Sequence, residues 1–257
     1  MNQVLTIARK EIVDGLRDFR SVLASLFYAL MGPGVVGLVS VAVGTKSSGA
    51  VVLTGMMAIF TLVSAFVGGM NVAMDTVAGE RERKSLLPLL LNAVPRERIV
   101  IGKWLAVSFF AVAGLVINIA GFAVVLVISG MRPAIGFRAL LVLGCGLLSL
   151  PLLAASVQLL ISTASHAVKE AQTYLSLVVF LPMAIGMFLV FSKAAEHGWL
   201  VYVPLVGQQM QLVSWMNGQT VDMWQPLVLG CLTVTVSVLG LLISNNRLHR
   251  DEILYGN

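Results

Sequence analysis

Charged residues are scarce in this 257-residue chain. Asp, Glu, Lys and Arg make up 11% of it, whereas hydrophobic residues make up 58%, and the mean hydropathy is +0.93. Soluble domains carry roughly 25% charged residues, so the composition excludes an ordinary soluble domain. It is the composition of an integral membrane protein.

Cysteine, histidine and nucleotide-binding motifs are also nearly or wholly missing. Cys145 and Cys231 fall inside apolar runs, where a thiol is usually a packing residue. Neither HExxH nor CxxC occurs among the few Cys and His. Lys103 follows a glycine but precedes Trp104, and the Gly-Thr-Lys run ending at Lys46 lacks the upstream part of a phosphate-binding loop. The sequence therefore predicts no catalytic centre, no metal site and no cofactor in this chain.

Six apolar runs are long enough to cross a bilayer. The hydrocarbon core takes about 20 residues per helix, and an open sheet in lipid would leave backbone groups unpaired. The predicted fold is therefore all-α, with one transmembrane domain over residues 1–257. The predicted spans are residues 22–44, 50–74, 104–129, 138–163, 172–192 and 226–244.

Basic residues are distributed unevenly between the two sides of this six-span arrangement. Thirteen of the 17 Lys and Arg lie in the N-terminal arm, the 79–103 stretch, the turn after the fourth span, and the tail. The positive-inside rule therefore places both termini and the 75–103 segment in the cytoplasm. The sequence predicts a multi-pass protein of the inner (plasma) membrane, with the lipid bilayer as a partner and nucleic acid excluded.

Two further segments are predicted to lie along the membrane surface. The N-terminal arm is amphipathic, which is typical of an interfacial helix on the cytoplasmic side. Residues 193–225 hold Trp199, Trp215 and Trp224, and aromatic residues of this kind gather at membrane interfaces. We expect one or two short helices there, in or dipping into the outer leaflet. The apolar face of the arm comprises Val4, Ile7, Ile12, Leu16 and Phe19.

A polar stretch from Gly79 to Trp104 separates the second and third spans. Mixed charges followed by exposed leucines predict docking onto another protein, held by a few apolar anchors. The alternative is a helix resting on lipid headgroups, although such helices favour Lys and Arg over a mixture of signs. The stretch contains Glu80, Arg81, Glu82, Arg83 and Lys84, then Leu86, Leu87, Leu89, Leu90 and Leu91, then Arg96, Glu97, Arg98 and Lys103.

Few polar groups fall within the predicted spans, and they are candidate pathway residues. Interhelical hydrogen bonding is the simpler interpretation of Asn118 and Gln158. Asn71 and Asp75 lie near the cytoplasmic end of the second span. No Asp or Glu lies well inside any predicted span, which argues against an ion-coupled carrier.

Methionine supplies two helical pairs, Met70 with Met74 and Met183 with Met187. Thioethers can bind Cu(I), but methionine is also the adaptable filler of apolar surfaces. We interpret both pairs as packing residues or as an accommodating apolar lining.

Several landmarks occur in order along the chain. They are IARKEIVDGLRDFRS, GERERKSLLPLLLNAVPRERIVIGKWLA, SHAVKEAQTYLSL with Leu181-Pro182, VPLVGQQMQLVSWMNGQ and NNRLHRDEILYG. Together they resemble the permease subunits of type-two ABC exporters, most of all the sodium-extrusion permeases, over nearly the whole chain. Those permeases usually carry a large outer domain after the first span, whereas residues 45–49 form only a short turn here.

The resemblance implies a six-helix permease that pairs with a second permease copy and with two cytosolic ATPase subunits, which hold ATP and Mg. It also implies a coupling helix over about 75–91. This chain would then move substrate out of the cytoplasm without being an enzyme itself. An ion-coupled secondary carrier and an intramembrane enzyme are the alternatives. The coupling residues that we predict are Asp75, Glu80, Arg81, Glu82, Arg83, Lys84, Leu86, Leu87, Leu90 and Leu91.

The predicted orientation can be tested by cysteine labelling. In a chain without Cys145 and Cys231, we expect single cysteines at Ser48 and Asn217 to react with an impermeant thiol reagent added outside intact cells. Cysteines at Ser85 and Asn246 should react only after the membrane is permeabilised. The reverse pattern would overturn the orientation, which is argued from the basic residues.

Overall fold

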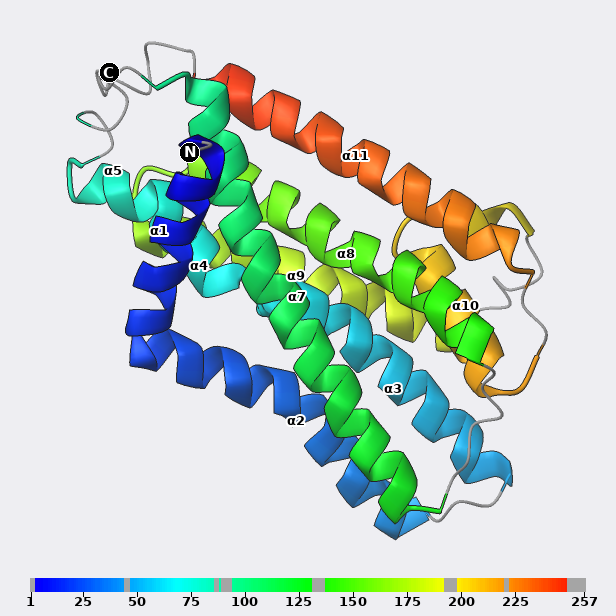
Figure 1. Ribbon diagram of the computed structural model, residues 1–257. Coiled ribbons are helices and arrows are strands. Elements are labelled where there is room, and N and C mark those ends of the chain that lie inside the picture. Colours follow the sequence, from blue (N-terminus) through cyan, green and yellow to red (C-terminus); the bar gives the residue numbers. More distant parts are fainter. Residues whose placement is uncertain are drawn as a thin grey trace.

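The computed structural model describes residues 3–43, 47–85, 88, 94–130, 137–191, 198–219 and 222–248. The described residues form helices and no strand (Figure 1). Six helical stretches are long and apolar enough to cross a membrane. The prediction of an all-α membrane protein with six spans is therefore confirmed.

The six spans differ in how simply they are built. The first is α2 (Phe19–Val43). The second is α3 (Ser47–Val67), continued by α4 (Met70–Met74), the π-helical turn η1 (Asp75–Gly79) and the short α5 (Glu80–Glu82). The remaining four are α7 (Arg96–Ile128), α8 (Phe137–Ala164), α9 (Val168–Phe191) and α11 (Trp224–Leu248).

Two spans extend further toward one end of the bundle than the sequence predicted. The second continues to Glu82 rather than ending at residue 74, and the third begins at Arg96 rather than at residue 104. Both extensions carry charged residues, which hydropathy alone assigns to a loop. They remain helical because neighbouring helices pack against them, with Val77, Ile99 and Val100 buried in one cluster.

The break between α3 and α4 is a close crossing with α7. A Cβ atom at Gly68 would lie 2.8 Å from the carbonyl oxygen of Phe110, and one at Gly114 would lie 3.0 Å from Gly68 Cα. Such contacts leave no room for a side chain, so the two backbones touch. Small residues allow this approach between membrane helices.

The π-helical turn η1 is supported from a neighbouring span. A π turn is wider than an α turn and interrupts the regular i to i+4 ladder. The buried amide of Ala78 donates to Ser162 Oγ of α8 at 3.1 Å. The second span is therefore held to α8 by a hydrogen bond where its own ladder is irregular.

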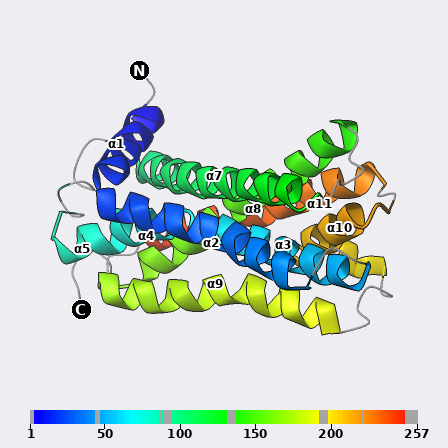
Figure 2. The ribbon, with the colours of Figure 1, turned by 90° about the horizontal axis from the view of Figure 1, so that it is seen from below.

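The N-terminal helix α1 (Gln3–Arg17) meets α2 at a sharp elbow and lies across one end of the bundle (Figure 2). Asp18 caps α2 by accepting from the Arg20 amide and the Ser21 hydroxyl. The hydrogen bond from Ser21 lowers the pKa of Asp18 below its usual value. A Cβ atom at Gly102 would lie 2.8 Å from Ile7, so α1 is also packed tightly on α7.

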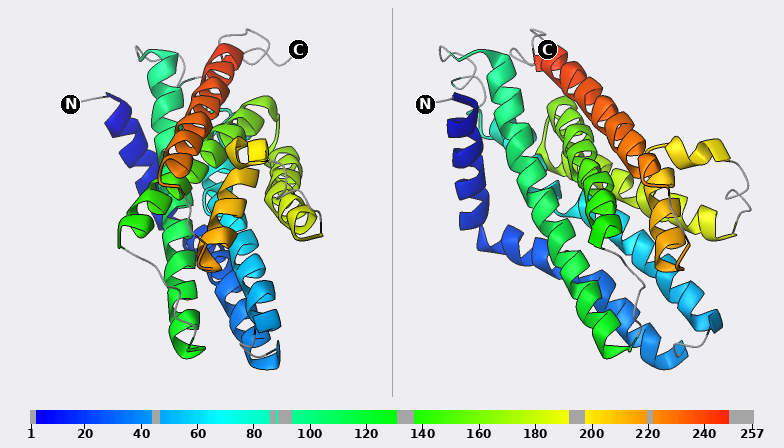
Figure 3. Two further views of the ribbon diagram at one scale, coloured as in Figure 1. Left: turned by 90° about the vertical axis from the view of Figure 1, so that its right-hand side faces the viewer. Right: turned by 45° about the vertical axis from the view of Figure 1, so that its right-hand side comes forward.

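The segment before the last span forms η3 (Gly198–Tyr202) and α10 (Val206–Met216), at the end of the bundle opposite α1 (Figure 3). The predicted short helices are therefore confirmed. Three glutamines of α10 are buried. Gln208 donates to Thr233 of α11, and Gln209 donates to the Gly186 carbonyl of α9. These bonds fix α10 between two spans.

The ends of the described chain lie together. The start of α1 and the end of α11 are at the end of the bundle where α5 also lies (Figure 1). Arg96, at the start of α7, donates to the Leu248 carbonyl at 2.9 Å. This bond satisfies an orphan acceptor of the last helical turn. The same end therefore gathers the start of α1, the end of α11 and the charged start of α7.

The close crossing makes a prediction about packing. Gly68→Ala should lower the free energy of unfolding by about 1–3 kcal/mol, because the added methyl group overlaps the α7 backbone. Gly144→Ala is the matched control, since its Cβ atom would meet nothing within 4 Å. Thermal unfolding of the detergent-solubilised protein measures both. Equal melting temperatures for the two variants would contradict a tight crossing.

Candidate functional site

The candidate site is a set of charged contacts around Lys103, which lies on α7 and is only 1% exposed. Its Nζ atom lies 2.9 Å from Glu80 Oε2 on α5 and 3.2 Å from Glu11 Oε1 on α1. It also donates to the carbonyl of Thr76 on η1. One buried ammonium group therefore joins α7 to three other elements.

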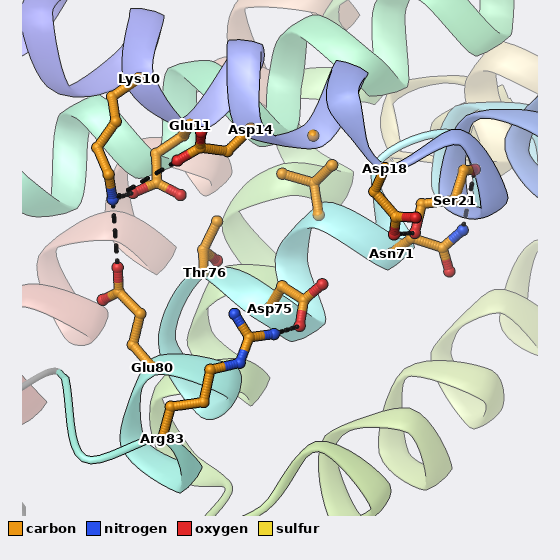
Figure 4. Close-up of a pocket in the computed structure, with 12 residues that line it drawn as sticks. Lys10, Glu11, Asp14, Asp18, Ser21, Asn71, Asp75, Thr76, Glu80 and Arg83 are labelled. Carbon is orange, nitrogen blue, oxygen red and sulfur yellow. Dashed lines mark hydrogen bonds and ion pairs between the residues drawn. The ribbon is translucent and has the colours of Figure 1, made fainter.

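Lys10 adds a second, more exposed cation to this network (Figure 4). Its Nζ atom lies 3.4 Å from Glu11 Oε1 and 3.9 Å from both Asp14 Oδ2 and Glu80 Oε1. Partial burial works to lower the pKa of Lys10, but Glu11, Glu80 and Asp14 outweigh it and hold that pKa above its usual value. Lys10 therefore stays charged and ties α1 to α5.

Arg81 points from α5 toward the end of α8. Its guanidinium donates to the carbonyl of Ser165 at 2.8 Å and to that of Thr163 at 3.3 Å. The last carbonyls of a helix have no partner within the helix, and the helix dipole favours a cation there. Arg81 therefore caps α8.

Glu82 points toward the start of α9. Its Oε2 atom accepts from the amide of Val168, the first residue of α9, at 2.9 Å. The first amides of a helix lack partners and favour an anion. Glu82 therefore supplies a cap that is 86 residues away in the chain.

The chain turns sharply after α5, the helix formed by Glu80, Arg81 and Glu82. Lys84 has a φ of +57°, which is a left-handed conformation typical of a helix end. The Ser85 amide donates to the Glu80 carbonyl at 2.9 Å and closes the turn. Arg83 pairs with Asp75 at 2.9 Å, but both side chains are largely exposed, so this pair contributes little to stability.

A cavity of about 320 Å³ opens between α1, the start of α2 and the α4–α5 segment (Figure 4). Five carboxylates and two basic side chains contribute to its lining. Within the described residues, no group of three or more Asp, Glu, His or Cys is placed to hold a metal ion. The charged lining residues are Glu11, Asp14, Asp18, Asp75, Glu80, Lys10 and Arg83.

The predicted coupling residues are thus only partly placed. Glu80, Arg81 and Glu82 turn toward α7, α8 and α9 respectively. Arg83 and Lys84 are exposed beside them, and Asp75 is partly exposed. The role of all these residues in coupling stays a prediction. Leu86, Leu87, Leu90 and Leu91 lie outside the described residues.

The predicted pathway amides bond across helix pairs. Asn118 of α7 donates to the Ala29 carbonyl of α2 at 2.9 Å. Gln158 of α8 donates to the Phe66 carbonyl of α3, and Asn71 of α4 donates to the Ser21 carbonyl of α2 at 3.4 Å. These are the contacts of helix-interface residues, and each joins a different pair of elements.

The two methionine pairs have different surroundings. Met70 and Met74 pack against the cluster that contains Phe110 and Leu175. Met183 and Met187 are exposed on α9, at 43% and 47%. The second pair is therefore the more exposed of the two.

Sequence reasoning missed two features of this structure. In the sequence Lys103 is one of many basic residues, although a lysine directly before a long apolar run is a candidate for burial. The glutamines of α10, Gln208, Gln209 and Gln211, belong to the segment that the sequence predicts to lie along the membrane surface. Three glutamines within four residues of a membrane chain were the signal that could have identified them.

Comparison with known proteins identifies the family. The model for "ABC-2 family transporter protein" matches residues 5–242. This chain belongs to that family. Family membership and the six spans confirm the prediction of a transmembrane ABC transporter permease.

Individual relatives carry matching names. The chain is 40% identical to "ABC transporter permease protein NatB" of Bacillus subtilis (strain 168), over 61% of this chain and 42% of that protein. It is 29% identical to "Probable ABC transporter permease protein NosY" of Stutzerimonas stutzeri, over 51% and 49%. The NosY of Pseudomonas aeruginosa is 30% identical over 58% of each chain. The chain thus spans about half the length of the curated relatives it matches.

The buried network predicts a large effect on stability. Lys103→Met should lower the free energy of unfolding by about 3–5 kcal/mol, because Glu11 and Glu80 would lose their buried ammonium partner and keep only the more exposed Lys10. The exposed pair provides the control, and Arg83→Gln should cost less than about 1 kcal/mol. Thermal unfolding in detergent measures both variants.

A third variant separates charge from packing. Lys103→Met combined with Glu11→Gln and Glu80→Gln leaves no uncompensated carboxylate, so it should recover part of the lost stability. If the triple variant is no more stable than Lys103→Met, the ion pairs are not what holds these elements together.

Proposed function

We propose that this chain is the permease of an ATP-driven exporter, and that residues 75–85 couple it to a separate ATPase subunit. Family membership and the names of the relatives support the class of transporter. The sequence has no phosphate-binding loop of its own. ATP and Mg would therefore be held by the partner, in two copies, beside a second copy of the permease.

The observation that carries this proposal is that three consecutive side chains contact three different spans. Glu80 pairs with α7, Arg81 caps α8 and Glu82 caps α9. A displacement of α5 therefore acts on three spans together. A loop held by lipid headgroups alone would not need such contacts. This geometry suits a segment that converts the movement of a partner into the movement of membrane helices.

The structure also offers places where such movement could be absorbed. The second span is interrupted at Gly68–Gly69 and again at the π-helical turn η1. Irregular turns of this kind are frequent at functional sites in helices. In the proposed mechanism, the partner pushes α5. The α4–α5 part of the second span then shifts together with the α8–α9 turn, while α3 stays packed on α7.

The outer face of α9 is the candidate surface for the second copy. Only 17% of the most apolar 18-residue stretch of α9 is buried, the smallest share among the six spans. Phe180, Met183 and Phe188 are among its exposed side chains. In this proposal substrate passes between the two copies, along an apolar surface that includes the Met183 and Met187 pair.

The first experiment is co-purification of the tagged permease with an ATP-hydrolysing partner from the native membrane. Recovery of a stoichiometric ATPase would separate the ABC permease from an ion-driven carrier and from an intramembrane enzyme. Purification of an active transporter without such a partner would overturn the proposal.

The coupling geometry makes a sharper prediction for the reconstituted complex. Arg81→Ala combined with Glu82→Ala should reduce ATP-driven transport on the order of tenfold, because α5 loses its hydrogen bonds to the ends of α8 and α9. ATPase activity and association with the partner should be retained. Leu87→Asp should instead weaken the association, if the leucines form the docking surface.

Glu97→Gln is the matched control. Glu97 is exposed on the first turn of α7 and takes part in no ion pair within the described part of the chain. We expect normal transport and a normal complex. Full transport by the Arg81 and Glu82 double variant would show that their helix caps do not transmit movement.

A further inference from the structure

The outward face of α1 combines apolar and basic side chains. Ala8 and Glu11 face inward and are buried. On the outward side, Leu5 is 60% exposed and Leu16 is 54% exposed, while Phe19 at the elbow is 72% exposed. An amphipathic helix that packed only against its own protein would not leave these large side chains uncovered.

Two arginines share this outward face. Residues 5, 9, 13 and 17 follow one another at intervals of four, so they form one stripe along the helix. The stripe therefore reads Leu5, Arg9, Val13 and Arg17. Both arginines are exposed, and neither takes part in an ion pair among the described residues.

The charge of these arginines is not balanced by the acids of the same helix. Glu11 and Asp14 line the cavity on the other side of α1 and pair with Lys10, and Glu11 also pairs with Lys103. The inward side of α1 is therefore internally compensated. The outward stripe keeps two guanidinium groups that can bind an external anion.

We propose that this face, formed by Leu5, Arg9, Leu16, Arg17 and Phe19, binds anionic phospholipids of the leaflet where α2 begins. Phe19 starts a span whose next exposed apolar residues include Leu23 and Phe27, so the face is continuous with a lipid-facing surface. Apolar side chains enter the acyl boundary. Guanidinium groups pair with phosphate oxygens in two parallel hydrogen bonds.

A soluble protein partner fits this surface less well. It would have to cover Phe19 and the start of α2, which lie where the polypeptide enters the bilayer. Anionic lipids supply the opposite charge at that depth, and basic residues near a negative leaflet are attracted to it. Anionic lipid binding does not depend on the proposed export function, because it requires only insertion of the six spans.

The test uses the full-length permease alone in vesicles. A bimane fluorophore is attached to Val13→Cys, between the two arginines, in a chain with Cys145→Ser and Cys231→Ser, since both native cysteines are exposed. Brominated phosphatidylglycerol or brominated phosphatidylcholine is added at equal bromine content. We expect the anionic lipid to quench at least about twofold more strongly, with the difference shrinking at high salt.

Two pairs of substitutions complete the experiment. Arg9→Gln with Arg17→Gln should bring the two lipids to equal quenching. Lys169→Gln with Arg247→Gln removes the same charge from exposed sites at the same end of the bundle and should keep the preference. Four results would overturn the proposal: equal quenching in the parent chain, quenching by neither lipid, a preference that survives in the first pair, or one that is lost in the control pair. The measurement needs no ATPase, so its failure is distinct from failure of the proposed function.

Discussion

The ammonium group of Lys103 imposes the constraint on which this end of the molecule depends. A charge that is 1% exposed must be paired, because an uncompensated buried ion costs several kcal/mol. Its partners, Glu11 and Glu80, come from elements that are not adjacent in the chain. Both α1 and α5 must therefore pack on α7 before Lys103 has its two carboxylate partners.

Other charged residues near Lys103 compensate unpaired groups at the ends of helices. Each helix leaves unpaired carbonyls at its last turn and unpaired amides at its first. Here Arg81 supplies donors to α8, Glu82 supplies an acceptor to α9, and Arg96 supplies a donor to α11. The charged extensions of the second and third spans thus cap the ends of three other helices, so arbitrary polar residues could not replace them.

Part of this organisation was readable from the sequence. Apolar runs predicted the six spans, because hydrocarbon thickness fixes helix length. The pairings were not readable, because Arg81 and Glu82 bond to residues more than eighty positions away, and charge sign alone does not say which neighbour a side chain meets. The α7 extension to Arg96 and the burial of Gln208 were missed for a related reason: hydropathy does not register polar residues that packing and hydrogen bonds compensate. The leucines assigned to docking lie outside the described residues.

The contacts of Arg81 and Glu82 have a consequence for the order in which the chain is made. Residues 80–82 leave the ribosome before Lys103, and well before Ser165 and Val168, with which they eventually bond. Until those partners have been made, the charges of residues 80–82 have none of these contacts, and α5 is not yet held to the other spans. A truncated or slowly inserted chain would therefore display this charged turn unpaired, as a mark of incomplete assembly that quality-control proteases could recognise.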